Sequence, residues 1–307
     1  MNESLALLRD GPIHILVNPL AGGRRSGTWA RHLQSFLASA NILARFHMTP
    51  SAAAAEQAAV EAIGNGAKVL LAMGGDGTLQ TLVNTPGVGS VVVGILPAGG
   101  GNDFAAALGL PRNPVEAMRA ILAGRLRSVD LALARTADGR ERRYCGGGGL
   151  GLDAEAAKYA GENYAAWSAK FRYVLSALRA LRTFAPVTVR AEFPERDEST
   201  LKKVLVAAAL NTPTYGAGLR LAANARIDDG LLDVVFIEKL PARDIASVLL
   251  QWTLRRGLRT PRISSIAAQS VVLTPDRHCL FHGDGEILGP APVKIRVLPG
   301  ALRVSAP

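Results

Sequence analysis

Three short segments combine glycines with side chains that can bind an anion or a metal ion. They are Asn18–Gly27, Gly74–Thr78 and Pro97–Ala105. Glycine lets backbone N–H groups come close to a phosphate, and a helix that begins directly afterwards adds the positive end of its dipole. Together the segments predict a binding site for a phosphorylated ligand.

Each segment has a second interpretation. The first lacks the Gly-Lys-Ser/Thr ending of a Walker A loop and the GxGxxG spacing of a dinucleotide-binding turn, so an ordinary turn is its alternative. Asp76 could hold a magnesium ion or a ribose hydroxyl, or it could cap the helix that follows it. Asn102 or Asp103 would likewise be a good N-cap for the helix expected to open there.

A fourth motif, Gly283-Asp284-Gly285-Glu286, lies near the C-terminus. A carboxylate in a site can act as a general base. The same residues also suit a hairpin turn, because Asp-Gly favours the tight turns between antiparallel strands. His282 directly precedes the motif and is expected to be a turn histidine. The five histidines show no spacing typical of metal ligands.

The three glycine-rich segments each follow a predicted buried strand. Strands that alternate with helices indicate a parallel sheet covered on both faces, and ligands bind at the carboxyl ends of such strands. The strands are expected at Ile13–Val17, Ala44–Met48, Lys68–Met73 and Ser90–Leu96, and the helices at Trp29–Ala40, at Ala52–Asn65, from about Thr78 and from Asn102.

The pattern changes near Ser128. Apolar and polar residues then alternate, as in Val187–Phe193 and Val293–Val297, which indicates a mostly antiparallel β-sandwich. Two helices, Trp167–Phe184 and Ala242–Gly257, are expected to interrupt it. We therefore predict a nucleotide-binding α/β domain over residues 1–130, to which the tail of about 299–307 returns, and a substrate domain over 131–298.

The amino-acid composition indicates which classes of partner the protein could bind. The chain has 307 residues and a net charge of +10, which favours an anionic partner. Aromatic residues make up 5%, too few for a surface that stacks single-stranded nucleic acid, so no nucleic-acid partner is expected. Two cysteines in no metal or disulfide pattern, no secretory leader and no apolar stretch of about 20 residues predict a cytoplasmic protein.

The motifs in this order resemble the diacylglycerol kinase catalytic domain of the bacterial lipid kinases, which is related to sphingosine and ceramide kinases. The similarity rests on Asn18–Gly23, Gly74–Thr78 and Pro97–Ala105, and it continues with Asp228–Val234 and Gly283–Glu286. It spans nearly the whole chain. The Gly-Gly-Asp-Gly-Thr motif alone is also shared with NAD kinases.

The resemblance implies an ATP- and Mg²⁺-dependent kinase that phosphorylates a hydroxyl of a membrane lipid such as diacylglycerol. It implies that Glu286 is the general base with Asp284 beside it, and that Asp76 faces the phosphates and the catalytic magnesium. Arg226 and Leu231, through backbone carbonyls, and Asp229, through its carboxylate, would hold a structural magnesium ion. The implied nucleotide-binding positions are Asn18, Pro19, Leu20, Ala21, Gly22, Thr49, Gly75, Asp76, Gly77, Thr78, Leu79, Gln80, Thr81, Gly100, Asn102 and Asp103.

Such a kinase would work at the inner membrane face, as a peripheral protein on an anionic surface, and could form a homodimer. The basic helical patterns Lys170–Phe184 and Ile245–Arg262 could lie on such a bilayer or pack on the sandwich.

Three residues depart from the family pattern. Gly100 replaces a hydroxyl residue, Thr81 replaces a carboxylate, and Ala106 stands where arginine is frequent. Two alternatives therefore stay open. One is an NAD-kinase-like enzyme that acts on a soluble nucleotide. The other is a sensor of low activity or none that binds nucleotide or lipid.

Overall fold

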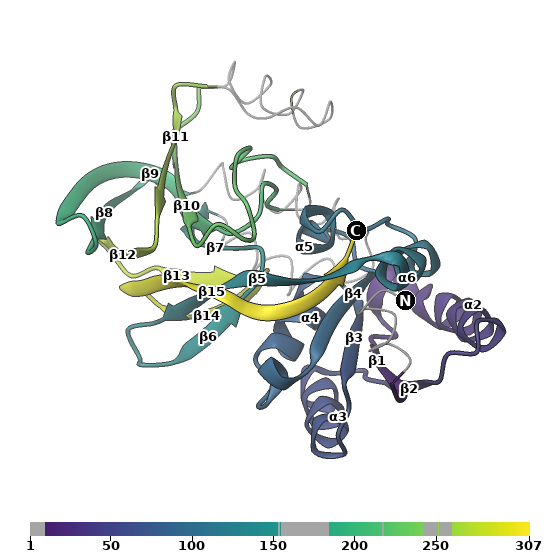
Figure 1. Cartoon of the computed structure of the whole chain (residues 1–307). Coiled ribbons are helices and arrows are strands. Elements are labelled where there is room, and N and C mark those ends of the chain that lie inside the picture. The colour runs from purple at the N-terminus through teal and green to yellow at the C-terminus, as the bar shows by residue number, and fades with distance from the viewer. Residues whose placement is uncertain (1–9, 153, 155–183, 217, 242–250, 252–259) are drawn as a thin grey trace. The chain divides into compact units, whose positions relative to one another are not determined.

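The computed structural model describes residues 10–152, 154, 184–216, 218–241, 251 and 260–307 (Figure 1). These residues form two compact units. Unit 1 comprises the chain up to Val129 together with Gly300–Pro307, and unit 2 comprises Asp130–Pro299. The division falls inside two strands, β5 (Arg125–Arg135) and β15 (Val293–Ala306).

Unit 1 contains a parallel sheet whose central strands are fully buried. From one edge, the strand order is β2, β1, β3, β4 and the end of β15, in which Arg303 and Val304 pair with Val92 and Val93. Runs of Val, Ile and Leu suit strands that are covered on both faces. The bounds are β1 Ile13–Val17, β2 Ala44–Met48, β3 Val69–Gly74 and β4 Val92–Pro97.

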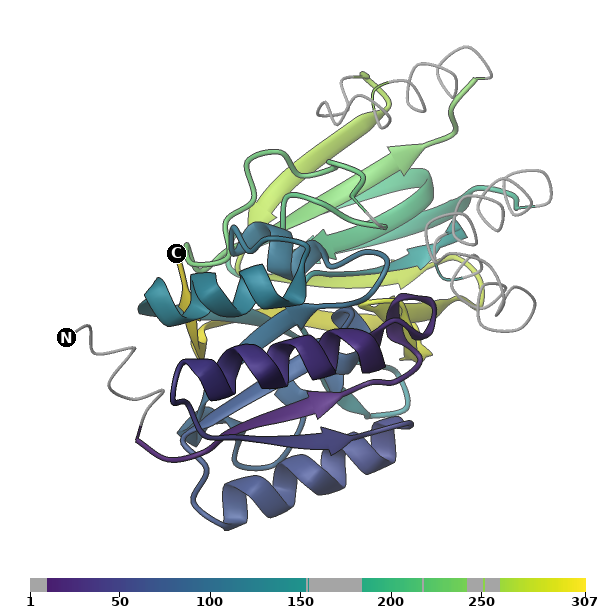
Figure 2. The ribbon, with the colours of Figure 1, turned by 90° about the vertical axis from the view of Figure 1, so that its right-hand side faces the viewer.

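Helices cover both faces of this sheet. Helices α2 and α6 pack on one face and α3 and α4 on the other, as Figure 2 shows for α2 and α3. Ser51 caps α3 and Asn113 caps α6 by accepting backbone N–H groups, which sets where these helices begin. The bounds are η1 Ala21–Arg24, α2 Ser26–Ser39, α3 Ala52–Gly64, α4 Asp76–Val83, η2 Val88–Ser90, α5 Asp103–Ala107 and α6 Pro114–Ala123.

Unit 2 is built from antiparallel strands. Its main order is β14, β13, β7, β9, β8, β12 and β15, while β10 joins β9 to β11, and β5 joins β15 to β6. In β8 the buried and outward residues alternate, as the sequence predicts. The bounds are β6 Glu141–Tyr144, β7 Gly147–Gly151, β8 Val187–Phe193, β9 Glu198–Leu210, β10 Leu232–Glu238, β11 Ile263–Ala268, β12 Ser270–Pro275, β13 Leu280–Gly283 and β14 Glu286–Pro290.

The second half of β9 is covered on both faces. Ala207 and Ala209 belong to the main core of unit 2, whereas Ala208 and Leu210 belong to a second core. That second core includes Tyr215 and other apolar residues of the segment after β9. This packing fixes the segment that leads to the predicted metal-binding residues.

The structure confirms the predicted fold class of a parallel α/β half followed by an antiparallel, sandwich-like half. Nearly all of the two helices expected inside the second half, and most of the two basic patterns, lie outside the described residues. Within the described residues, no helix is long and apolar enough to cross a membrane.

Candidate functional site

The glycine-rich segments of unit 1 are joined at the carboxyl ends of β1, β3 and β4. The N–H of Asn18, directly after β1, donates to the carbonyl of Met73 in β3 at 3.0 Å. The N–H groups of Ala98 and Gly99, after β4, donate to the carbonyl of Gly74 at 2.8 and 3.1 Å. Because parallel strands end at one edge, three segments that are distant in the sequence come together.

Two of the glycines are required by how closely these segments approach each other. A Cβ atom on Gly99 would lie 2.5 Å from Gly75 Cα, so only glycine fits there. Gly22 has φ 61°, and a Cβ on it would lie 2.6 Å from the carbonyl oxygen of Ala98. The backbones of all three segments are therefore packed against one another.

Asp76 fixes the third segment to the second. Its carboxylate accepts hydrogen bonds from the N–H of Asp103 at 3.2 Å and from the N–H of Phe104 at 3.3 Å. It therefore caps the first turn of α5 and not its own helix α4, whose N-cap is Gly75. A carboxylate has about four lone-pair positions, of which these two bonds use two.

Asn102, one of the two predicted N-caps, stands at the N-cap position of α5, but its side chain makes no capping hydrogen bond. Its backbone is left-handed with φ 60°, which asparagine tolerates better than most residues. Its side chain instead closes the turn around Gly99, accepting from the N–H at 3.1 Å and donating to the carbonyl at 2.8 Å. The side chain that accepts the first N–H groups of α5 is that of Asp76.

The other predicted nucleotide-binding positions differ in exposure. Thr49 is buried after β2 and donates to the carbonyl of Val17, while Asn18 donates to the Thr78 hydroxyl. Leu79 and Gln80 are buried, so the side chain of Leu79 belongs to the core. Leu20 and Gly100 are exposed, and Thr81 Oγ1 donates to the carbonyl of Gly77. Pro19, Ala21, Gly77 and Asp103 are partly buried.

In unit 2, Asp284 and Gly285 form the turn between β13 and β14. Both residues have positive φ, 49° and 89°, as a tight hairpin turn requires. The Asp284 carboxylate accepts from the N–H groups of Cys145, Gly146 and Gly147 at 2.7, 2.9 and 3.2 Å. It thereby anchors the turn to the segment that enters β7.

Burial raises the pKa of Asp284 to about 6, although the three backbone N–H groups and His282 act in the opposite direction. His282 is not a turn histidine, which corrects the prediction. It is buried in β13, and its Nε2 lies 2.7 Å from the hydroxyl of Tyr215.

Glu286 is the first residue of β14, and its side chain is exposed. Partial desolvation by the surrounding protein nevertheless raises the pKa of its carboxyl, while the guanidinium of Arg142 acts to lower it. A carboxylate that is accessible and more basic than usual is suited to take a proton from a hydroxyl group.

The predicted magnesium loop is the segment 226–231. In the sequence it lies between Ala225, which belongs to the second core, and the start of β10. Asp229 accepts from the N–H of Leu231 at 3.1 Å, and the Arg226 side chain pairs with Asp228 at 3.3 Å. Burial and the charge of Asp229 raise the pKa of Asp233. Backbone carbonyls and a carboxylate are oxygen donors of the kind that hard cations prefer, so this donor set fits magnesium.

The described residues contain no group of three or more His, Cys, Asp or Glu side chains that could hold a metal ion. A magnesium ion held by one or two carboxylates together with substrate phosphates does not require such a group.

Two buried residues of unit 2, Asp130 and Asn211, connect the segment that enters β7 with the predicted magnesium loop. The sequence analysis did not predict either of them. Asp130 is buried, and its Oδ2 accepts from the N–H of Gly230 at 2.7 Å. Asn211 is fully buried, and its Nδ2 donates to the carbonyls of Asp130 and Cys145, each at 2.9 Å. A lone acid in the apolar run Val129–Ala134 was a usable signal for Asp130, because acids are rarely buried without a partner.

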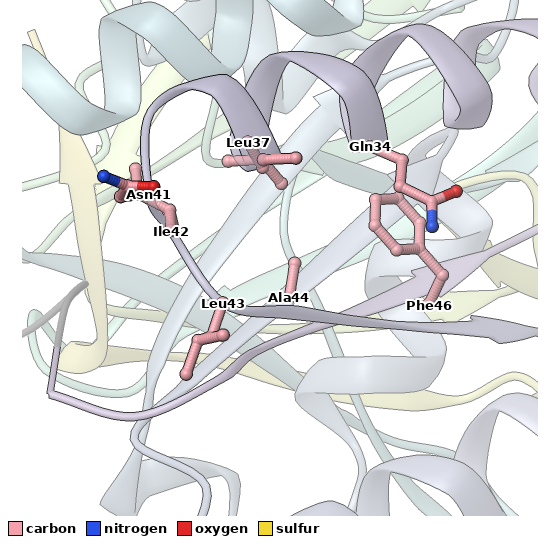
Figure 3. A pocket seen from close by; sticks show the side chains of 8 residues that line it. Gln34, Leu37, Asn41, Ile42, Leu43, Ala44 and Phe46 are labelled. Carbon is pink, nitrogen blue, oxygen red and sulfur yellow. The ribbon is translucent and has the colours of Figure 1, made fainter.

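A hollow of about 360 Å³ lies elsewhere on unit 1, between α2 and β2 (Figure 3). Leu43 and Ala44 line it at the amino end of β2, opposite the edge that carries the glycine-rich segments. It is therefore separate from the candidate site. Its lining residues are Gln34, Leu37, Ala38, Asn41, Ile42, Leu43, Ala44 and Phe46.

Residues 12–134 match the diacylglycerol kinase catalytic domain, and residues 148–306 match the YegS C-terminal NAD kinase beta sandwich-like domain. The chain belongs to the family of diacylglycerol kinases and YegS lipid kinases. The family consists of lipid kinases, which are phosphotransferases.

Relatives of this diacylglycerol kinase family member cover most of its length. A "Diacylglycerol kinase" from Mycobacterium tuberculosis H37Rv is 28% identical over 253 residues, which are 80% of this chain and 79% of the relative. A "Probable lipid kinase YegS" from Escherichia coli SMS-3-5 is 30% identical over 249 residues, 79% of each chain. A crystal structure of a diacylglycerol kinase from Bacillus anthracis str. Sterne has TM-score 0.72 at 20% identity and covers 96% of this chain and 97% of its own.

Proposed function

We propose that this family member transfers the γ-phosphate of ATP to a hydroxyl of a membrane lipid of the diacylglycerol type, with Mg²⁺ as the metal ion. The observation that carries the proposal is the union of three glycine-rich segments at one edge of the unit 1 sheet. Phosphoryl transfer needs a positioned phosphate chain and charge neutralisation more than covalent help from the protein. In this proposal other backbone N–H groups of the same segments, such as those of Gly75 and Gly100, supply the positioning.

In this proposal Glu286 accepts the proton of the lipid hydroxyl. Its exposure and its raised pKa support that assignment. Asp284 has a different function in our proposal, because three backbone N–H groups occupy its carboxylate. It holds the hairpin that carries Glu286 and does not accept the proton itself.

Mg²⁺, when bound to the nucleotide, would neutralise phosphate charge. Asp76 is the residue of unit 1 that we assign to it, in addition to its capping of α5. A second ion would be held by Asp229 and by the carbonyls of Arg226 and Leu231. The bond between Asp130 and the N–H of Gly230 supports this assignment, because it fixes the loop that contains Asp229.

We infer that the protein acts at an anionic membrane surface on the inner face of the membrane. The net charge of +10 supports an attraction to such a surface.

The test is an assay with ATP labelled in its γ-phosphate, Mg²⁺, and diacylglycerol in vesicles of phosphatidylglycerol and phosphatidylcholine. The proposal expects label in the lipid fraction, and less of it when phosphatidylglycerol is omitted. Label that enters NAD without vesicles would instead favour the NAD-kinase-like alternative. Nucleotide binding without transfer to diacylglycerol or to any lipid of a whole lipid extract would favour a sensor.

A further inference from the structure

We propose that Asn211 is a positioning residue for the proton-accepting hairpin of unit 2. This inference rests on the proposed function of Glu286. The residue stands directly after β9 and is fully buried, and its hydrogen bonds go to backbone carbonyls of Asp130, Cys145 and Gly146. It acts through the backbone segment to which the hairpin is anchored.

The first step is the contact between the hairpin and that segment. Asp284 accepts three N–H groups from Cys145–Gly147, and its own N–H donates to the carbonyl of Gly147 at 2.9 Å. Glu286 follows two residues later, as the first residue of β14. A shift of the segment therefore moves the base.

The second step is the contact between that segment and Asn211. The N–H of Asn211 donates to the carbonyl of Gly146 at 2.8 Å, and its Nδ2 donates to the carbonyl of Cys145 at 2.9 Å. The other proton of Nδ2 goes to the carbonyl of Asp130, also at 2.9 Å. Because both neighbours are carbonyl oxygens, only the NH₂ group can face them, and the orientation of the amide is fixed.

The third step leads from Asp130 to the loop at 226–231. The N–H of Asp130 donates to the carbonyl of Ile227, and its carboxylate accepts from Gly230, both at 2.7 Å. Asn211 thus joins the anchor of the hairpin to the residue that holds the proposed magnesium loop. One buried amide side chain fixes two parts of unit 2 that are far apart in the sequence.

The chemistry at this position is specific for an amide. Aspartate has nearly the same shape but would direct an oxygen at two carbonyl oxygens and would donate to neither. Alanine would remove this donor from both carbonyls. Asn211→Asp and Asn211→Ala therefore test the same claim in two ways.

The experiment measures backbone hydrogen exchange and steady-state kinetics on the full chain. In both variants we expect faster exchange at Cys145–Gly147 and at Gly230. We expect kcat for the lipid to fall about 100-fold, the size typical of a catalytic group displaced by about 1 Å. The KM for ATP should change less than about threefold, because the nucleotide is assigned to unit 1.

The matched control is Ser305→Ala. It removes one buried hydrogen bond of unit 1, from the serine hydroxyl to the carbonyl of Ile121 at 2.7 Å. It should lower the melting temperature without changing exchange at Gly230, and its kcat should stay close to the original value.

The outcomes are decisive in both directions. If the Asn211 variants melt earlier but exchange normally at both segments, or if they keep kcat, the inference is wrong. If the unmodified protein phosphorylates no lipid, the proposed function fails, and the exchange measurement still decides whether Asn211 joins the two segments. If one of the two Asn211 variants does not fold, the measurements are made on the other.

Discussion

Oδ2 of Asp76 accepts a hydrogen bond from the backbone N–H of Asp103 at 3.2 Å, across 27 residues of sequence. The acid of the second glycine-rich segment therefore caps the helix that follows the third. Its carboxylate serves the architecture of the site before any ligand is bound. Such charge-assisted bonds contribute about 1.5–3 kcal/mol each.

Replacement of Asp76 should separate its capping function from contact with a ligand. Asp76→Ala removes both acceptors of α5, whereas Asp76→Asn keeps one. Without nucleotide, we expect the alanine variant to unfold at a lower temperature than the asparagine variant, and both below the original protein. Equal melting of all three proteins, measured by calorimetry, would show that the cap is energetically unimportant.

Gly99 should be intolerant of any side chain. A Cβ there would lie 2.5 Å from Gly75 Cα, so the third segment must move away from the second. Overpacking of this kind costs about 1–3 kcal/mol, and we expect Mg-ATP to bind about tenfold more weakly or worse to Gly99→Ala. Titration calorimetry measures this. The control is Gly64→Ala, because a Cβ at Gly64 would meet no atom within 4 Å.

The histidine pair on β1 and β2 should make stability depend on pH. His14 Nδ1 and His47 Nε2 lie 3.1 Å apart. Burial lowers the pKa of both; Arg45 and His47 also lower that of His14, while Arg45 lowers and Glu61 raises that of His47. The unfolded chain thus binds more protons just below the ordinary pKa of 6.5, so this contribution to stability falls as the pH falls below that value.

Urea unfolding at several pH values tests the pair. The stability difference between the original protein and His47→Gln should grow as the pH rises toward about 6.5 and stay constant above about 7.5. A difference that is independent of pH would contradict the burial argument.

Asp284 should make stability depend on pH in the direction opposite to that of the histidine pair. Its pKa is about 6 in the folded protein, against an ordinary 3.8, so the folded state holds a proton that the unfolded state has lost. The contribution of this group to stability therefore falls as the pH rises from 3.8 to about 6. The stability difference between the original protein and Asp284→Asn should shrink across that window. A difference that widens with rising pH would show that the three N–H groups outweigh burial.

Much of the fold could be predicted because its signals are local. The strands β1 and β2 were predicted with the bounds that the structure has, and the alternation of apolar and polar residues predicted β8. The starts of α2 and α4 were missed by two or three residues, since Ser26 and Asp76 lie within glycine-rich segments where helical periodicity is not yet visible.

The site could be predicted only as a set of segments. That Asp76 caps α5, that His282 is buried against Tyr215, and that Asn211 binds the carbonyls of Asp130 and Cys145 all depend on pairings distant in sequence. A single sequence carries no local pattern for such contacts. The nucleotide-binding, metal-binding and catalytic functions of the individual residues stay predictions.

The most direct measurement compares Glu286→Gln with the original protein in transfer of labelled γ-phosphate to diacylglycerol in anionic vesicles. Glu192→Gln, at an exposed position of β8, is the control. The account predicts that Glu286→Gln folds and binds Mg-ATP normally but loses about 100-fold or more in kcat, as expected for a lost general base, while the control keeps its rate. A Glu286→Gln protein that phosphorylates lipid at the original rate would contradict the account.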